Sequence, residues 1–258
     1  MRLPSAARLR YLRELVLHLT RRELSLSYQN TILGWTWPLA RQLFQLAVLV
    51  FVFSKVLDLN IKDYPAFVFC GLIVFTWLSN GTLAASRSIL ANRHFGLRPG
   101  FPTAVLPIIA ISVALFDALV ALPVLLVILA LGHDLSAAVL LLPIAFLVQF
   151  VLMAGLAWLC ASLSVILRDI PNLVGLLVLL GFYVTPVYFD VARVPERYQW
   201  VLRLNPAAIF IEADRAILLG TPWPPVGSVV GVTVVSFAVA AGGYACFRRL
   251  SLSFADEL

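Results

Sequence analysis

Charged side chains are scarce in this sequence: they make up 12% of its 258 residues, whereas apolar residues make up 62%. Soluble domains carry about 25% charged residues, and a chain of this length has too little interior to bury such an apolar excess. The mean hydropathy of +0.98 points the same way. The shortage of charge therefore excludes an ordinary soluble domain and predicts an all-α integral membrane protein.

Lysine is rarer still, since the chain contains only Lys55 and Lys62. A P-loop needs a lysine followed by serine or threonine after a glycine-rich turn, whereas Val56 and Asp63 follow these two. No nucleic-acid-binding module is visible, because the basic residues flank apolar runs. We therefore expect no ATPase activity, no cofactor and no nucleic-acid partner for this chain, so that any energy from ATP comes through another subunit.

Cysteine and histidine are also few. Cys70, Cys160 and Cys246 are an odd number, far apart and all within apolar runs, which favours packing over a disulfide framework. No two histidines have the spacing of metal ligands. These histidines are His18, His94 and His133. The sequence therefore predicts no metal site.

Six apolar runs are long enough, or nearly so, to cross a hydrocarbon core of about 30 Å. They cover residues 33–57, 64–86, 105–131, 137–167, 172–189 and 226–247. Six crossings place both termini on one side of the membrane. The 172–189 run is the shortest of these and is also compatible with a broken or re-entrant helix.

Arginine placement predicts the orientation of these spans. With the N-terminus inside, the inner segments carry thirteen arginines against five acidic residues, and the outer segments carry six cations against seven. Cytoplasmic segments retain cations, so we expect both termini inside. We expect no cleaved signal peptide, because the first long apolar run exceeds the length of a signal-peptide core.

Residues 8–28 have the pattern of an amphipathic helix, which we place within a cytoplasmic segment covering 1–30. Its apolar stripe consists of Leu9, Leu12, Val16, Leu19 and Leu26. Such a helix can lie in the inner membrane interface with its cations near the headgroups. The alternative is a short cytoplasmic helix that packs on protein.

Two segments between spans are open to a functional interpretation. Residues 87–100 are either a basic cytoplasmic loop or a short helix that a cytosolic partner grips, with Phe95 and Leu97 as apolar contacts. In the outer region 190–225, Pro195 can begin one short helix, Asn205 can cap a second, and Gly220 can end it. This pair either dips back toward the membrane or lies flat as an aromatic belt.

Asp117 is the only ionisable residue deep within one of these spans. For it we favour a hydrogen bond to a hydroxyl or backbone group on a neighbouring helix over a transport role. Aromatic residues gather around Pro186 instead. They are Phe182, Tyr183, Tyr188 and Phe189. Aromatic rings stack on the apolar faces of sugars, and phenols add hydrogen bonds, so this cluster could line a path for a polar polymer.

Two segments of the chain are distinctive: RRELSLSYQNTILGWTWPL at 21–39 and RDIPNLVGLLVLLGFYVTPVYF at 168–189. The second is followed by LNP at 204–206 and by Arg215. Together these segments resemble the membrane (permease) subunits of type-2 ABC exporters of lipid-linked polysaccharides, including the O-antigen and teichoic-acid exporters. The resemblance covers essentially the whole chain as a single transmembrane domain. It implies a homodimer in the bacterial inner membrane, bound to two copies of a cytosolic ATPase that holds the ATP and magnesium.

The resemblance also implies roles for residues. Contacts with the ATPase would come from Arg13, Arg21, Arg22, Arg87, Arg93, His94, Phe95, Arg98, Arg168 and Asp169. The sugar channel and outer gate would be lined by Trp35, Trp37, Phe182, Tyr183, Tyr188, Phe189, Tyr198, Trp200 and Phe210. The helices at 195–219 would form the outer gate.

Three other functions remain open at this point. An integral-membrane enzyme acting on lipid-linked sugars or phospholipids would need clustered acidic or histidine residues near one interface, and only His133 with Asp134 comes near this. A secondary carrier would need paired broken helices and inverted repeats. An ABC permease for another cargo, such as capsule, teichoic acid, galactan, a lipid or a drug, fits the same features as the polysaccharide exporter.

Overall fold

The computed structural model describes residues 5–29, 33–57, 61, 63–96, 100–132 and 137–254. Within these ranges the regular structure is helical and no strand occurs, which confirms the all-α prediction. The predictions for Leu97, Arg98, His133 and the Trp35 side chain lie outside this description. The main helices are α1 (Ser5–Tyr28), α2 (Trp37–Val50), α3 (Tyr64–Ala91), α4 (Arg93–Gly96), α5 (Val105–Gly132), α6 (Leu142–Ile166), α7 (Ile170–Val184), α8 (Glu196–Leu204), α9 (Pro206–Leu219) and α10 (Val226–Leu250). The shorter elements are η1 (Gly34–Thr36), the π-helix η2 (Phe51–Val56), η3 (Ala137–Leu141), η4 (Val191–Arg193) and η5 (Ser251–Ser253).

Within the described ranges, five helices are long and apolar enough to cross a membrane. They are Trp37–Val56, Tyr64–Ala91, Val105–Leu131, Ala138–Ile166 and Val226–Ser253. The 172–189 run forms only the fifteen-residue helix α7, which is about 22 Å long at 1.5 Å per residue. The sixth crossing therefore stays a prediction, while the chain is a multi-pass membrane protein.

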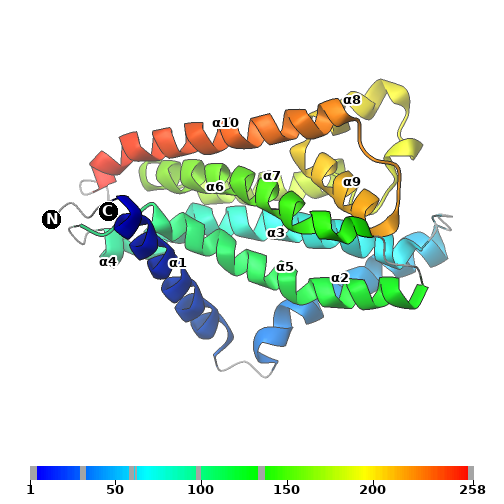
Figure 1. The fold of residues 1–258 in the computed structure, drawn as a ribbon, viewed down its shortest axis with the longest axis horizontal. Coiled ribbons are helices and arrows are strands. Elements are labelled where there is room, and N and C mark those ends of the chain that lie inside the picture. Colours follow the sequence, from blue (N-terminus) through cyan, green and yellow to red (C-terminus); the bar gives the residue numbers. More distant parts are fainter. Residues whose placement is uncertain are drawn as a thin grey trace.

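Helix α3 is the centre of the bundle. It packs against α5, α6, α7, α9 and α2, and Figure 1 shows it between its neighbours along the length of the molecule. Two side chains find hydrogen-bond partners across this core. Trp77 of α3 donates its indole N–H to the Ile111 carbonyl of α5 at 3.3 Å, and Gln149 of α6 donates to the Val74 carbonyl of α3 at 3.0 Å. Such bonds are needed where no water can serve polar groups.

The ends of three helices meet in one apolar cluster. The cluster consists of Ile89, Ala161, Val165, Phe247 and Phe254. It joins the C-terminal ends of α3, α6 and α10, and the beginning of α1 lies with α4 at this same end of the bundle (Figure 1). The described chain therefore begins and ends at the same end of the bundle (Figure 1).

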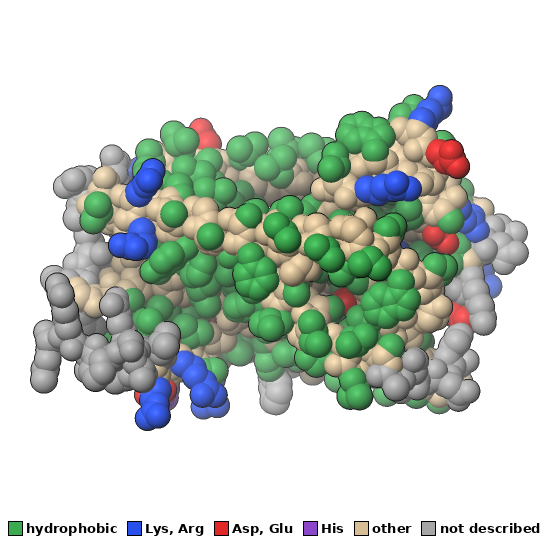
Figure 2. All heavy atoms as spheres, turned by 45° about the horizontal axis from the view of Figure 1, so that its top comes forward, with side chains coloured by type: hydrophobic (Ala, Val, Ile, Leu, Met, Phe, Trp, Pro, Cys, Tyr) green, Lys and Arg blue, Asp and Glu red, His purple; other side chains and the backbone are tan. Residues whose placement is uncertain are grey.

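The surface follows the pattern of a membrane protein. Figure 2 shows apolar side chains over the middle of the visible face, with charged side chains mostly toward the two ends. A hydrocarbon core excludes charge while the interfaces accept it. The apolar excess of the sequence is thus placed where lipid would contact it.

Candidate functional site

Helix α1 packs on the bundle through its apolar stripe. Leu12, Leu15, Val16 and Leu19 lie against a cluster of Val105, Leu106 and Ile109 at the start of α5. Leu26, which the sequence assigns to the same stripe, is half exposed. The interpretation that this helix packs on protein therefore holds for most of the stripe, and its position in a bilayer interface stays a prediction.

The C-terminal end of α1 is fixed by one hydrogen bond. The Tyr28 hydroxyl donates to Oδ1 of Asp117 at 2.6 Å, which confirms that the lone acid of the spans bonds to a hydroxyl on a neighbouring helix. Burial, together with this bond, raises the pKa of Tyr28 above its ordinary value. The phenol thus remains a donor to Asp117 at physiological pH.

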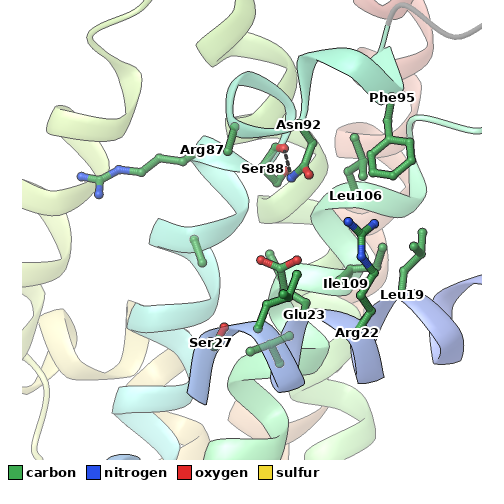
Figure 3. Close-up of a pocket in the computed structure, with 15 residues that line it drawn as sticks. Leu19, Arg22, Glu23, Ser27, Arg87, Ser88, Asn92, Phe95, Leu106 and Ile109 are labelled. Atoms are coloured by element: carbon green, nitrogen blue, oxygen red, sulfur yellow. Dashed lines mark hydrogen bonds between the residues drawn. The ribbon is translucent and has the colours of Figure 1, made fainter. Parts of the chain in front are cut away.

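A cavity of about 430 Å³ lies between α1, α3, α4 and α5. Arg22, Arg87 and Phe95 are among its lining residues. Figure 3 shows Arg22 and Glu23 rising from α1 toward the part of the cavity near Asn92 and Phe95, whereas the Arg87 side chain extends away from them. The structure thus brings together two predicted ATPase contacts, Arg22 of α1 and Phe95 of α4.

The described charged residues and histidine among the predicted ATPase contacts are on the surface. They are Arg13, Arg21, Arg22, Arg87, Arg93, His94, Arg168 and Asp169, and all are exposed. Phe95 differs, because it is half buried and stacks on Phe101 with ring centroids 4.9 Å apart. The short helix expected in 87–100 is present as the single turn α4. Arg168 and Asp169 lie between α6 and α7, beyond the end of α6.

The aromatic residues around Pro186 form one cluster with Tyr188 near its centre. Tyr188 contacts Phe182 and Phe189, with ring centroids 5.7 and 5.2 Å apart, and Phe182 contacts Tyr183 at 5.8 Å. The sequence prediction that these four residues gather is confirmed. Their role as a channel lining stays a prediction.

Two members of this aromatic cluster were missed by the sequence analysis. Phe53 of η2 stacks on Tyr188 at 4.9 Å, and Phe75 of α3 meets Phe182 edge-on at 5.4 Å. Both lie in other predicted spans, where a phenylalanine cannot be told from an ordinary lipid contact. Only their contacts with Tyr188 and Phe182 identify them as members of the cluster.

The other predicted lining residues are placed elsewhere. Tyr198 and Trp200 are exposed on α8, Trp37 is exposed on the first turn of α2, and Phe210 is buried in α9. Among the described ring pairs, none joins these four to the cluster around Tyr188. The structure thus divides the predicted lining into a cluster at the end of α7 and scattered aromatic residues.

The outer region 190–225 forms the two short helices that its turn residues indicate. Asn205 caps α9 by accepting from the Ala207 amide at 3.0 Å, and Gly220 ends it in a left-handed conformation with φ +65°. Pro195 lies one residue before the first residue of α8. Helix α9 is almost wholly buried and contacts α3, α6 and α10, whereas α8 is largely exposed. Whether the pair dips back toward the membrane or lies flat as an aromatic belt stays a prediction.

Arg215 of α9 is a buried charged side chain, since only 3% of its surface is exposed. It donates from Nε and Nη2 to the Phe67 carbonyl at 3.2 and 3.1 Å, and from Nη2 to the Val187 carbonyl at 2.7 Å. Its guanidinium carbon also lies 3.4 Å from the centroid of the Phe67 ring. Burial raises the pKa of the adjacent Asp214 from its ordinary value to about 8.

The described residues hold no group of three or more His, Cys, Asp or Glu side chains suited to a metal ion. The arrangement consists of an exposed basic end, a buried central helix, and an aromatic cluster near the opposite end. With the apolar helices, these features define a multi-pass membrane protein. The chain belongs to the ABC-2 type transporter family, whose profile matches residues 14–219. It is accordingly a transporter permease subunit, and the family pairs with an ABC ATPase subunit.

Several relatives match nearly the full chain. An O-antigen export system permease protein RfbA from Myxococcus xanthus is 26% identical over 249 residues, which cover 95% of this chain and 96% of the relative. Two proteins of the same name from Klebsiella pneumoniae are 26% and 27% identical over 251 residues, which cover 96% of both chains in each case.

Proposed function

We propose that this chain is the permease subunit of an ATP-driven exporter that moves a lipid-linked, O-antigen-like polysaccharide outward across the bacterial inner membrane. Two copies of the chain form the path, and two copies of a separate ATPase drive it. The observation that carries the proposal is the match over about 95% of the chain to relatives named O-antigen export permeases.

The aromatic cluster supports a polar, ring-shaped cargo. Tyr183 is 62% exposed and meets Phe182, which in turn contacts Tyr188. Rings of this kind can stack on sugar faces, and the phenols can hydrogen-bond to hydroxyl groups. In the dimer, this cluster from each copy would face a shared path that a glycan can traverse without strong binding at one point.

The basic end supports coupling to a nucleotide-hydrolysing partner. Arg93 and His94 of α4 are exposed, and Phe95 beside them is anchored on Phe101. A charged rim around an apolar anchor is a common form of protein interface. ATP-driven movement of the partner would thus be transmitted to α3 through α4, which follows directly after it.

The test is export by the reconstituted permease and its ATPase in vesicles, with lipid-linked O-antigen as cargo. We expect ATP-dependent transfer of glycan across the bilayer. Arg93→Ala should lower export by about ten-fold, the loss expected for one arginine anchor of an interface, while ATP hydrolysis changes little. The matched control is Arg203→Ala. Arg203 is also exposed, but its helix α8 lies at the end of the bundle opposite to α4 (Figure 1).

Other results would contradict the proposal. Export by the permease without ATP or without an ATPase would remove the assigned role. Transport of capsule, teichoic acid, galactan, a lipid or a drug in place of O-antigen would keep the ABC permease and replace the cargo. Normal coupling in Arg93→Ala would refute the assignment of α4 as the contact with the ATPase.

A further inference from the structure

The segment 185–189, between α7 and η4, is held by side chains from two other helices. Arg215 of α9 donates to the Val187 carbonyl at 2.7 Å. Asn205, the residue that caps α9, donates from Nδ2 to the Thr185 hydroxyl at 2.9 Å. We call the side chains of Tyr64, Asn205 and Arg215 the outer latch.

The third bond of the outer latch comes from α3. The Tyr64 hydroxyl at the start of this helix donates to the Tyr188 carbonyl at 2.9 Å. The ring of the same Tyr188 stacks on Phe53 and contacts Phe182. The latch therefore fixes the backbone of the residue whose ring lies at the centre of the aromatic cluster.

The guanidinium of Arg215 is suited to this position. All three of its hydrogen bonds end on the backbone carbonyls of Phe67 and Val187, which belong to different elements. A planar fork of N–H donors can serve two carbonyls at once, which a lysine ammonium on a flexible stem does less well. A buried charge is costly unless its donors are used, so this side chain favours the state in which both carbonyls are present.

Gly71 of α3 makes room for the contact. A Cβ atom at this position would lie 2.9 Å from the Val187 carbonyl oxygen and 3.0 Å from Nη2 of Arg215. Both distances are too short for van der Waals contact with a side-chain carbon. Any larger residue at position 71 would therefore push the 185–189 segment and the guanidinium away from α3.

We propose that the outer latch joins α9, the start of α3 and the end of α7 into one body, and that Arg215 is the positioning residue that keeps the outer end of the path shut in the resting transporter. This inference rests on the proposed export function. Opening then requires the guanidinium of Arg215 to leave the carbonyls of Phe67 and Val187. Helix α9 and the aromatic cluster are therefore joined only while the path is shut.

The test compares Arg215→Met with Arg203→Met in the reconstituted permease–ATPase complex. Arg203 offers the same substitution on an exposed part of the neighbouring helix α8. Hydrogen exchange should become about ten-fold faster or more in 185–189 and in α9 of Arg215→Met, because a hydrogen bond to a charged group is typically worth at least that factor. In Arg203→Met, exchange in these segments should match the wild type.

Passive leak of calcein from the vesicles without ATP is the second measurement. Leak should rise by about the same factor in Arg215→Met, with assembly with the ATPase unchanged. Unchanged exchange in 185–189 and α9 would overturn the latch. Faster exchange with no rise in leak would overturn its role as a barrier, and the export assay would still decide the proposed function by itself.

Two further variants keep the inference testable if Arg215→Met does not fold. Tyr64→Phe removes a single hydroxyl and should loosen 185–189 less than the arginine change does. Gly71→Ala keeps every polar group of the latch but fills its space, so it should raise both exchange and leak. Wild-type exchange and leak in both variants would overturn the proposal.

Discussion

Asp117 is stabilised by a partner from outside the spans. An acid in an apolar helix needs hydrogen bonds that water cannot supply there, and the Tyr28 hydroxyl of α1 provides one at 2.6 Å. Because α1 also contacts α5 near its start, the bond and the apolar stripe together fix the direction in which α1 crosses α5. One hydroxyl thus helps to dock a whole helix.

Tyr28→Phe should release the C-terminal part of α1. Loss of a hydrogen bond to a carboxyl group costs about 1.5–3 kcal/mol, so the end of α1 should open more often and trypsin should cleave after Arg21 and Arg22 about ten-fold faster. The rate of appearance of the cleaved chain, followed by mass spectrometry, measures this. Tyr11→Phe, the same change at an exposed position of the same helix, should cleave like the wild type, and equal rates in all three proteins would show that the bond does not hold α1.

At this scale the sequence identifies kinds of contact but few partners. It predicts that Asp117 meets a hydroxyl, because an isolated acid in a span demands one. It does not indicate Tyr28, which is 89 positions away and lies on a helix whose tilt no local pattern encodes. Arg215 is similar: the sequence analysis assigned it to an outer segment, and its burial against Phe67 and Val187 depends on how α9 folds back.

The contact between α6 and α10 depends on two glycines. Gly155 and Gly243 face each other so closely that a Cβ on Gly243 would clash with the Gly155 carbonyl group, and a Cβ on Gly155 would clash with the backbone at Val239 and Ala240. Small residues allow such close helix packing in membranes, where dispersion contacts replace the hydrophobic driving force. This pair of helices consequently has little tolerance for added volume.

Gly243→Ala should separate α6 from α10 and destabilise the bundle by about 1–3 kcal/mol, the usual range for overpacking. The measurement is thermal unfolding of the purified protein in detergent, with a lower Tm expected. Gly242→Ala is a close control, because a Cβ there meets nothing within 4 Å and alanine has the better helix propensity. If the two variants unfold at the same temperature, the close crossing is not a determinant of stability.

Helix ends were more predictable than helix packing. Asn205 and Gly220 mark the limits of α9 because capping and the left-handed conformation depend on local chemistry. The π-helical turn η2 and the packing of α9 against α3, α6 and α10 depend on distant contacts, so neither follows from a local pattern. The short length of α7 agrees with the sequence, because the 172–189 run is the shortest of the six apolar runs.

The arrangement of the two ends defines the orientation to be tested. Helix α4 and the end of α10 lie at one end of the bundle (Figure 1), where we expect the cytoplasm on the basis of the arginine distribution. Helix α8 lies at the other end of the bundle, where α10 begins (Figure 1). A six-crossing protein with both termini inside requires this separation.

Cysteine labelling in intact cells measures that orientation. In a variant without Cys70, Cys160 and Cys246, a membrane-impermeant maleimide should label Tyr198→Cys on α8 and should leave Leu252→Cys unlabelled until the cells are opened. Both positions are exposed, so accessibility of the side chain itself is matched. Labelling of Leu252→Cys but not of Tyr198→Cys in intact cells would reverse the orientation, and labelling of both would show that α10 does not cross the membrane.

Helix α3 has a mechanical consequence for the whole molecule. Its 28 residues form one continuous helix from Tyr64 to Ala91, which is about 42 Å long. One end carries the acceptor of Arg215 and the other leads into α4. With no proline beyond its first turn and no break between, this helix is one rigid link between the Arg215 contact and α4. A displacement of α4 along the axis of α3 would therefore also shift the Phe67 carbonyl.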